Sequence, residues 1–147
     1  TNDKWQTYIK TNFDLKGLKL FSGSSCEYMQ ACDLIIAASG TVTLEAVILD
    51  IPIIACYKLN KISYSLAKVL IKLKYFSLPN ILADKKVIPE FIQDQVNTDN
   101  LYLESIKFLN NQDLVFNTLD NFVELKKLLH PYGSIKKAAK IIIDDMN

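Results

Sequence analysis

The sequence predicts an α/β domain with an incomplete, doubly wound parallel sheet and a helical C-terminal tail. Short strand patterns at residues 18–21, 34–38 and 53–57 alternate with helical patterns, which is typical of such sheets. A chain of 147 residues allows one domain with its own core. Only these three strands are secure, whereas sheets average about five or six. We therefore expect the first units of the domain to be missing; the alternative is a genuinely small three-stranded fold.

Composition excludes several classes of protein. Half of the residues are hydrophobic and 22% are charged, which excludes an intrinsically disordered chain. No apolar run approaches the roughly 20 residues of a membrane-spanning helix, and the polar N-terminus is no secretory signal. Three cysteines fit a reducing cytosol rather than a disulfide scaffold, and we expect them to be buried structural thiols.

The first elements follow from local patterns. Residues 3–13 carry a helical pattern, and residues 18–21 are predicted to form a short strand. The turn at residues 22–25 is suited to cap a helix that runs through Met29.

The next elements form the centre of the predicted sheet. Residues 34–38 are a continuous apolar run, which suits a strand buried on both faces. A helix follows over residues 41–49, and Pro52 opens the strand at 53–57. A longer helix is predicted over residues 60–73.

Beyond this helix the pattern changes to mostly helical. Residues 75–77 are a candidate fourth strand, and residues 77–80 form a turn. Pro89 suits the first position of a short helix through Gln93. Later helices are predicted over residues 97–109, 113–129 and 134–145.

The positive charge is concentrated in one segment. Residues 51–83 carry five lysines and no acidic residue, while both flanks are acidic. Lys61, Lys68 and Lys72 fall on one helix face. This face is either simply solvated or attracted to anionic lipid headgroups. We do not expect nucleic-acid binding, because the segment lacks interleaved exposed aromatic residues and a known nucleic-acid-binding motif.

The segment most informative about chemistry lies at the end of the 34–38 strand. Ser39, Gly40 and Thr41 join this strand to the following helix, where open α/β sheets bind ligands. Free N–H groups at a helix start attract anions, and Gly40 allows a phosphate to approach the backbone. Glu45 lies one turn further, about 6 Å along the axis, within reach of ribose hydroxyls. The alternative is an ordinary capped helix with Thr41 as its N-cap.

Several motifs in a fixed order make a family resemblance specific. They are Ser39-Gly40-Thr41-Val42-Thr43-Leu44-Glu45, Pro52, Tyr57, Ser77-Leu78-Pro79-Asn80-Ile81-Leu82-Ala83 and Pro89-Glu90-Phe91-Ile92-Gln93. Together they resemble the lipid-A-disaccharide synthases, bacterial glycosyltransferases of the GT-B architecture. The resemblance covers essentially the whole chain but only the C-terminal part of that enzyme.

The resemblance implies a fold and a reaction. Residues 1–95 would form an incomplete, Rossmann-like nucleotide-sugar-binding domain, with residues 96–147 as a helical segment packed on it. The family transfers 2,3-diacylglucosamine from its UDP conjugate to 2,3-diacylglucosamine 1-phosphate, giving a β-1,6-linked disaccharide phosphate and UDP in lipid A synthesis. This part would bind the donor. We expect it to be inactive alone.

Site residues are carried over position by position. The resemblance implies that Ser39, Gly40 and Thr41 hold the diphosphate and that Glu45 holds the ribose. It also implies that Asn80, Glu90 and Gln93 line the donor cleft. The last two would share one face of the short helix.

A departure from the family concerns charge. The family usually has arginine after the residue that corresponds to Tyr57, whereas this chain has Lys58. A lysine neutralises phosphate as a point charge but forms no planar fork, so Lys58 is a weaker candidate phosphate contact.

No metal, cofactor or catalytic residue is expected in this segment. The family's candidate base lies on the N-terminal part. The sequence has no Asp-x-Asp motif, which is consistent with metal-independent transfer.

The resemblance also implies partners and a location. The partners are the two acylated substrates, the missing N-terminal domain and a second copy in a homodimer. The location is the cytoplasm, with peripheral contact to the inner membrane. Two alternatives stay open: a different GT-B UDP-sugar transferase, and a non-catalytic remnant or interaction module.

Overall fold

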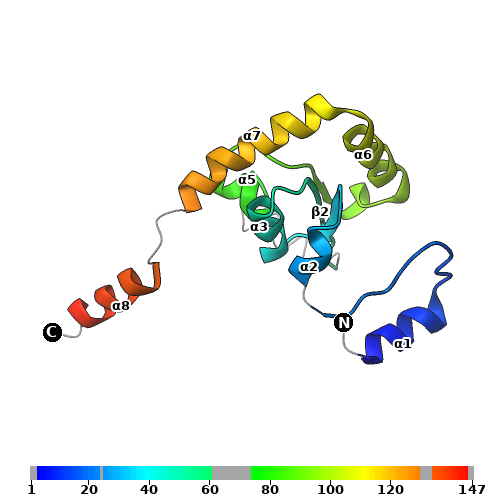
Figure 1. The fold of residues 1–147 in the computed structure, drawn as a ribbon, viewed down its shortest axis with the longest axis horizontal. Coiled ribbons are helices and arrows are strands. Elements are labelled where there is room, and N and C mark those ends of the chain that lie inside the picture. The colour runs from blue at the N-terminus through cyan, green and yellow to red at the C-terminus, as the bar shows by residue number, and fades with distance from the viewer. Residues whose placement is uncertain (1–2, 24, 61–73, 130–133, 146–147) are drawn as a thin grey trace. The chain divides into compact units, whose positions relative to one another are not determined.

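The computed structural model describes most of the chain as two compact units (Figure 1). The described residues are 3–23, 25–60, 74–129 and 134–145. One unit belongs to Thr1–Cys32 and the other to Asp33–Asn147. From residue 61 onward, the predicted helix over 60–73 lies outside the described residues, and so does its lysine-rich face.

The first unit contains two of the predicted helices. They are α1 (Asp3–Asn12) and α2 (Ser25–Met29). The strand predicted at residues 18–21 is wrong, because no strand is found in the described part of this unit. A strand needs a neighbour to complete its hydrogen-bond ladder, and here Leu18 is 66% exposed. Phe21 stacks on Tyr28 instead, with ring centroids 4.5 Å apart.

The second unit is built on a parallel sheet in the order β1-β2-β3. β1 (Ile35–Ala38) and β2 (Ile53–Tyr57) are the two predicted apolar runs, and β3 (Glu90–Ile92) pairs with the later part of β2. The α/β class with a parallel sheet is therefore confirmed. The three described strands follow chain order without a reversal, so the doubly wound arrangement stays a prediction.

The third strand lies where the sequence predicts a short helix. Over residues 89–93 the structure has β3 followed by a 3-10 turn, η1 (Gln93–Gln95), so the helix prediction is wrong. Ala55 N donates to Pro89 O at 2.9 Å, and a proline is tolerated at the start of a strand because it needs no donor there. Pairing with β2 thus outweighs the helix-start preference of proline. Residues 75–77, the candidate fourth strand, form no strand.

β1 is less covered than its apolar sequence predicts. Its residues alternate between half-buried and exposed, and Ile36 is 51% exposed. The predicted burial on both faces is therefore wrong. In β2 the first three residues are buried. β1 is the edge of the sheet among the strands that the structure describes, so β2 covers only one of its sides.

α3 (Thr41–Ile48) confirms the helix predicted after β1. It contacts β1 and β2, and its buried residues are Thr43, Ala46 and Val47. The helix ends in a Schellman motif, in which Ile51 N donates to Ala46 O at 3.0 Å and Asp50 takes a left-handed φ of 57°. Lys126 Nζ lies 2.6 Å from the Asp50 carboxylate, which ties this turn to the C-terminal helices.

Three further helices complete the core. α5 (Leu78–Ala83) takes the place of most of the predicted turn at 77–80, while α6 (Thr98–Asn110) and α7 (Gln112–Leu129) confirm predicted helices. The Asn97 and Asn111 side chains accept hydrogen bonds from the first turns of α6 and α7. α3 contacts α5 and α7, and α6 contacts β2. The buried side chains of α6 and α7 are Phe108, Thr118, Phe122 and Leu125.

The last described helix is α8 (Ser134–Asp145), as predicted. Its residues 136–145 are exposed. No helix within the described ranges combines the length and apolar character needed to cross a membrane. The proposed domain division at residue 95 stays a prediction.

Candidate functional site

The predicted phosphate turn lies at the carboxyl end of β1, where Gly40 is the N-cap of α3. Its backbone is extended, with φ 169° and ψ −161°, a conformation open to any residue. A Cβ built on Gly40 meets no atom of the described residues within 4 Å. The fold itself therefore does not require glycine here. The open space beside it is suited to a ligand that approaches the backbone closely.

The first turn of α3 leaves donors available for such a ligand. No side chain caps the helix, and Thr41, which the capped-helix alternative made the N-cap, is the first helical residue. The Thr43 hydroxyl donates to Gly40 O at 2.6 Å and so fixes the turn. The first N–H groups of a helix have no intrahelical acceptor. Those of Thr41 and Val42 therefore form a site with partial positive charge.

Two predicted charged residues are accessible near this end of the sheet. Glu45 is half-buried one turn into α3, and Lys58 is exposed directly after β2. Neither side chain forms an ion pair with the residues that the structure describes. Both side chains are therefore available to a ligand.

Ser39 is held by the fold rather than left free. Its backbone N donates to Cys56 O at 2.7 Å, and its hydroxyl donates to Phe76 O at 2.9 Å. The hydroxyl proton is thus already used, and only the oxygen lone pairs remain to meet a donor. This contact fastens the segment before α5 to the end of β1.

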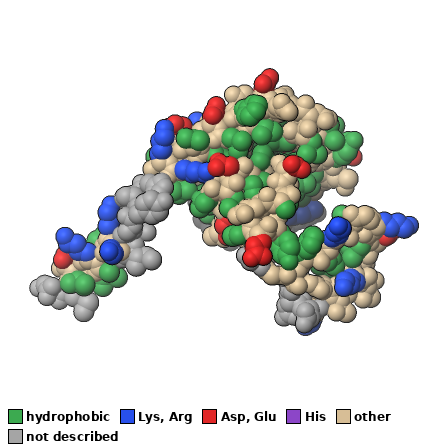
Figure 2. Space-filling view, viewed as in Figure 1, with side chains coloured by type: hydrophobic (Ala, Val, Ile, Leu, Met, Phe, Trp, Pro, Cys, Tyr) green, Lys and Arg blue, Asp and Glu red, His purple; other side chains and the backbone are tan. Residues whose placement is uncertain are grey.

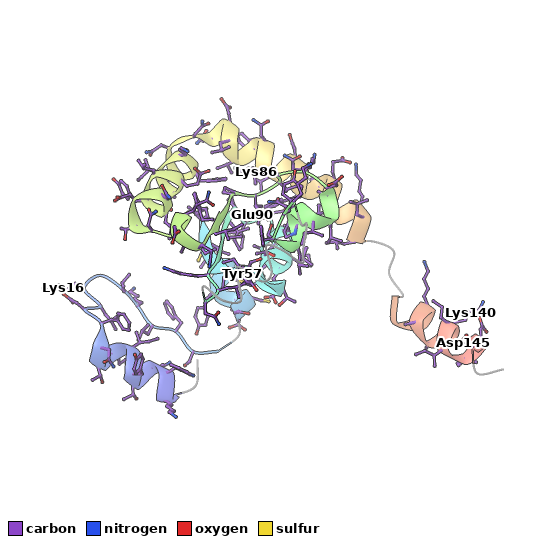
Figure 3. The ribbon with its side chains drawn as sticks, turned by 180° about the vertical axis from the view of Figure 1, so that it is seen from behind. Lys16, Tyr57, Lys86, Glu90, Lys140 and Asp145 are labelled. Carbon is purple, nitrogen blue, oxygen red and sulfur yellow. The ribbon has the colours of Figure 1, made fainter. Side chains whose placement is uncertain are left out.

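Glu90 is likewise engaged with the chain. Its carboxylate accepts hydrogen bonds from Phe76 N at 3.1 Å, Ser77 N at 2.6 Å and the Ser77 hydroxyl. Because Glu90 is the first residue of β3, it shares no helix face with Gln93. Figure 3 shows Glu90 close to Tyr57 in projection, and the Tyr57 ring lies 6.4 Å from that of Phe76.

Asn80 is fully buried, and its side-chain amide is fully used. Its Oδ1 accepts from Val87 N at 2.6 Å and Ile88 N at 2.9 Å, while its Nδ2 donates to Ile88 O at 2.9 Å. The side chain therefore holds the segment before β3 against α5. It presents no exposed atom to a ligand.

Gln93 clamps the backbone that follows β2. Its Oε1 accepts from Leu59 N at 2.7 Å and its Nε2 donates to Leu59 O at 3.1 Å. Gln93 has a φ of 52°, in the left-handed region that is costly for residues other than glycine. The two hydrogen bonds help to hold it there. Gln93 thus orients the loop that carries Lys58.

The predicted residues therefore fall into two groups. Gly40, Thr41, Glu45 and Lys58 offer accessible atoms. Ser39, Asn80, Glu90 and Gln93 hold loops in place. Sequence reasoning missed the partners of the second group, which are backbone groups of Leu59, Phe76, Ser77, Val87 and Ile88. It also missed the Thr43 hydroxyl, which bonds Gly40 O of the first group. Ser77 and Thr43 could have been found from the sequence, because both lie inside the motifs that carry the family resemblance.

The cysteines differ from one another. Cys26 and Cys32 are exposed, so their predicted burial is wrong, whereas Cys56 in β2 is half-buried. Burial raises the pKa of the Cys56 thiol above its ordinary value. No group of residues within the described ranges could hold a metal ion.

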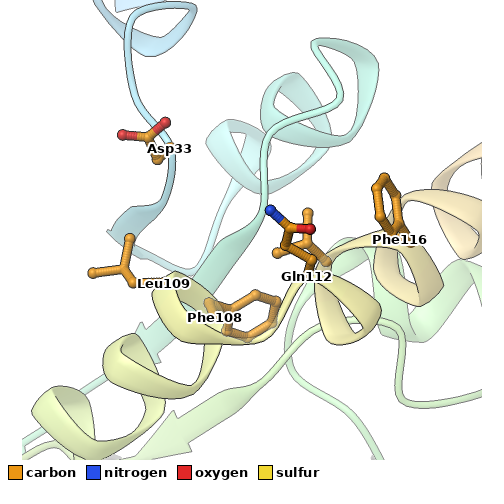
Figure 4. A pocket seen from close by; sticks show the side chains of 6 residues that line it. Asp33, Phe108, Leu109, Gln112 and Phe116 are labelled. Carbon is orange, nitrogen blue, oxygen red and sulfur yellow. The ribbon is translucent and has the colours of Figure 1, made fainter.

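A shallow hollow lies at the opposite end of the sheet (Figure 4). It is lined by Asp33, Phe108, Leu109, Gln112, Val115 and Phe116. Asp33 precedes β1, so the hollow is at the amino end of this strand and is distinct from the Gly40 turn.

Hydrophobic side chains lie at the surface of the second unit among lysines and carboxylates (Figure 2).

Comparison with known sequences gives one consistent family. The family described as "Lipid-A-disaccharide synthetase" matches residues 3–142. The chain is 44% identical over 103 residues to the lipid-A-disaccharide synthase of Acinetobacter baylyi, covering 70% of this chain and 26% of that protein. It is 35% identical over 136 residues to that of Sulfurihydrogenibium sp., covering 92% and 35%.

A third relative agrees. The lipid-A-disaccharide synthase of Haemophilus ducreyi is 40% identical over 131 residues, covering 86% of this chain and 33% of that protein. The chain thus spans about a quarter to a third of the length of these curated relatives.

Proposed function

Because the chain belongs to the lipid-A-disaccharide synthase family, we propose that it is the C-terminal, donor-binding part of such a glycosyltransferase. Its α/β unit would be the later portion of the Rossmann-like domain of a GT-B enzyme. The uncovered edge of β1 supports this view, because further strands of a longer domain would find their neighbour there.

In the proposed reaction, a hydroxyl of 2,3-diacylglucosamine 1-phosphate attacks the anomeric carbon of UDP-2,3-diacylglucosamine. The glycosidic bond to phosphate breaks and UDP leaves with the electron pair. The chain would bind the UDP portion and stabilise its negative charge. We place the base that deprotonates the acceptor on the N-terminal part of the complete enzyme, so no residue here is assigned that role.

The observation that carries the proposal is the uncapped start of α3 beside Gly40. The diphosphate would accept hydrogen bonds from the Thr41 and Val42 N–H groups and from the Thr41 hydroxyl. Glu45, one turn further, would accept from the ribose hydroxyls. Lys58 would add a positive charge near the phosphates.

The other predicted residues receive a supporting role. We propose that Ser39, Asn80, Glu90 and Gln93 shape the donor site through the backbone segments that they hold. A homodimer, the N-terminal part of the enzyme and a cytoplasmic location at the inner membrane remain part of the proposal.

Calorimetric titration of the full chain with UDP tests the site. A Cβ at Gly40 meets no atom of the described residues but would occupy the space assigned to phosphate. We therefore expect Gly40→Ala to weaken UDP binding at least tenfold, about 1.4 kcal/mol, without lowering the melting temperature.

Glu45→Gln supplies the matching test of the ribose contact. It keeps the shape of the side chain and removes its charge, and we expect UDP to bind about fivefold more weakly. Glu124→Gln, on the exposed surface of α7, serves as the control. Unchanged UDP affinity in both Gly40→Ala and Glu45→Gln would contradict the proposed site.

A further inference from the structure

Two of the sequence motifs are fastened to each other around the backbone of Phe76 and Ser77. From one side, Glu90 of β3 accepts hydrogen bonds from both of their N–H groups and from the Ser77 hydroxyl. From the other side, the Ser39 hydroxyl donates to Phe76 O. The segment thus bridges the start of β3 and the end of β1.

The register of the sheet explains why these groups can meet. In a parallel sheet, residues opposite one another point to the same face, and alternate residues of a strand share that face. Glu90 lies opposite Ala55, and Tyr57 is two residues further along β2. Cys56 lies opposite Ala38, so Ser39 continues β1 at the level of Tyr57. Ser39, Tyr57 and Glu90 therefore face the same side of the sheet.

The carboxylate of Glu90 suits its position because every group that it bonds is a hydrogen-bond donor. Hydrogen bonds from N–H groups to a carboxylate are about twice as strong as those between neutral groups. No lysine forms an ion pair with Glu90 in the described part of the chain. Backbone donors and one hydroxyl satisfy its charge instead. A glutamine would keep the shape but turn an amide donor toward one of these N–H groups.

We propose that Glu90 is a positioning residue: it holds Phe76 and Ser77 against Ser39 and so fixes the orientation of the Gly40 turn that receives the diphosphate. Glu90 itself does not touch the nucleotide. This inference rests on the proposed function for the identity of the ligand, but the coupling from Glu90 to the turn exists without ligand.

The first test uses the full chain without UDP. Backbone amide resonances are compared among wild type, Glu90→Gln and the control Glu124→Gln. We expect Glu90→Gln to shift the Gly40 and Thr41 resonances, although the hydrogen bonds of Glu90 within the described residues go only to Phe76 and Ser77. Glu124→Gln should leave both resonances in place. Unshifted Gly40 and Thr41 resonances in Glu90→Gln would overturn the proposal.

The second test is a double-mutant cycle read by UDP titration. We expect Glu90→Gln and Ser39→Ala each to raise the dissociation constant about tenfold. Because both act through Phe76, the double variant should also lose only about tenfold. A loss of about a hundredfold in the double variant would mean independent effects and would overturn the proposal.

A milder variant covers the case in which Glu90→Gln does not fold. Ser77→Ala removes only the hydroxyl bond to Glu90, and we expect it to shift the same two resonances and weaken UDP about threefold. If wild type binds no UDP, the proposed function fails for this chain. The resonances of Gly40 and Thr41 then still decide the positioning role by themselves.

Discussion

Replacing Asn80 by alanine should destabilise the fold more than almost any other polar substitution in this chain. The side chain is fully buried and makes three hydrogen bonds to the backbone of Val87 and Ile88, which are 6% and 1% exposed. Each bond contributes about 1 kcal/mol net. Alanine also leaves two N–H groups and one carbonyl buried without these partners. We therefore expect a loss of about 3–4 kcal/mol, from a total that is typically about 5–15 kcal/mol.

Urea denaturation followed by circular dichroism measures this loss at constant m-value. Asn121→Ala is the matched control, because Asn121 bonds Lys85 Nζ at the exposed surface, and it should cost less than about 1 kcal/mol. A destabilisation below about 1 kcal/mol would refute the structural role that the hydrogen bonds assign to Asn80.

Three further outcomes are expected. Gln93→Ala removes both bonds to Leu59, so hydrogen exchange at the Leu59 amide should accelerate at least tenfold while melting changes little. Phe122→Ala empties a fully buried site and should cost about 3–5 kcal/mol in urea denaturation. Because burial raises the pKa of the Cys56 thiol, its thiolate is scarcer below that pKa. Mass spectrometry after iodoacetamide at pH 8 should therefore show Cys26 and Cys32 modified before Cys56, with the difference shrinking as pH rises through the raised pKa.

Locally encoded elements were predictable from the sequence. β1, α3 and β2 follow from apolar runs separated by a helix-start motif and by Pro52, and each signal lies within a few residues of the element it defines. α6 and α7 follow in the same way from helical periodicity and from start signals at Asn97 and Asp113, although the structure shows that the side chain that caps α7 is that of Asn111.

Elements that depend on distant partners were not predictable. β3 is only three residues long and exists because β2 offers it a parallel neighbour. Residues 18–21, three of which are hydrophobic, carry a stronger local strand signal, yet they form no strand because pairing decides the outcome. A short run therefore says little about strand formation until its neighbour is known.

The candidate site shows the same difference between features set by local sequence and features set by distant partners. The helix start after Gly40 is a local feature, and the structure places it as the motif indicates. The structure gives Gln93 a partner 34 residues away, Leu59, and gives Ser39 one 37 residues away, Phe76. Motif spacing shows that such polar residues matter but not whether they face a ligand or the backbone.

The outer edge of β1 has a consequence for the behaviour of this chain in solution. Ile35 N donates to Pro52 O just before β2, and Ser39 N donates to Cys56 O within β2. The alternate amides of Ile36 and Ala38 therefore point to the other edge. Such an edge, with the half-exposed Ile36 beside it, can template the addition of a strand from another molecule. Self-association of the isolated chain should therefore grow with concentration. The exposed edge of β1, which leads into the Gly40 turn, therefore limits the concentration at which a sample of this chain stays monomeric.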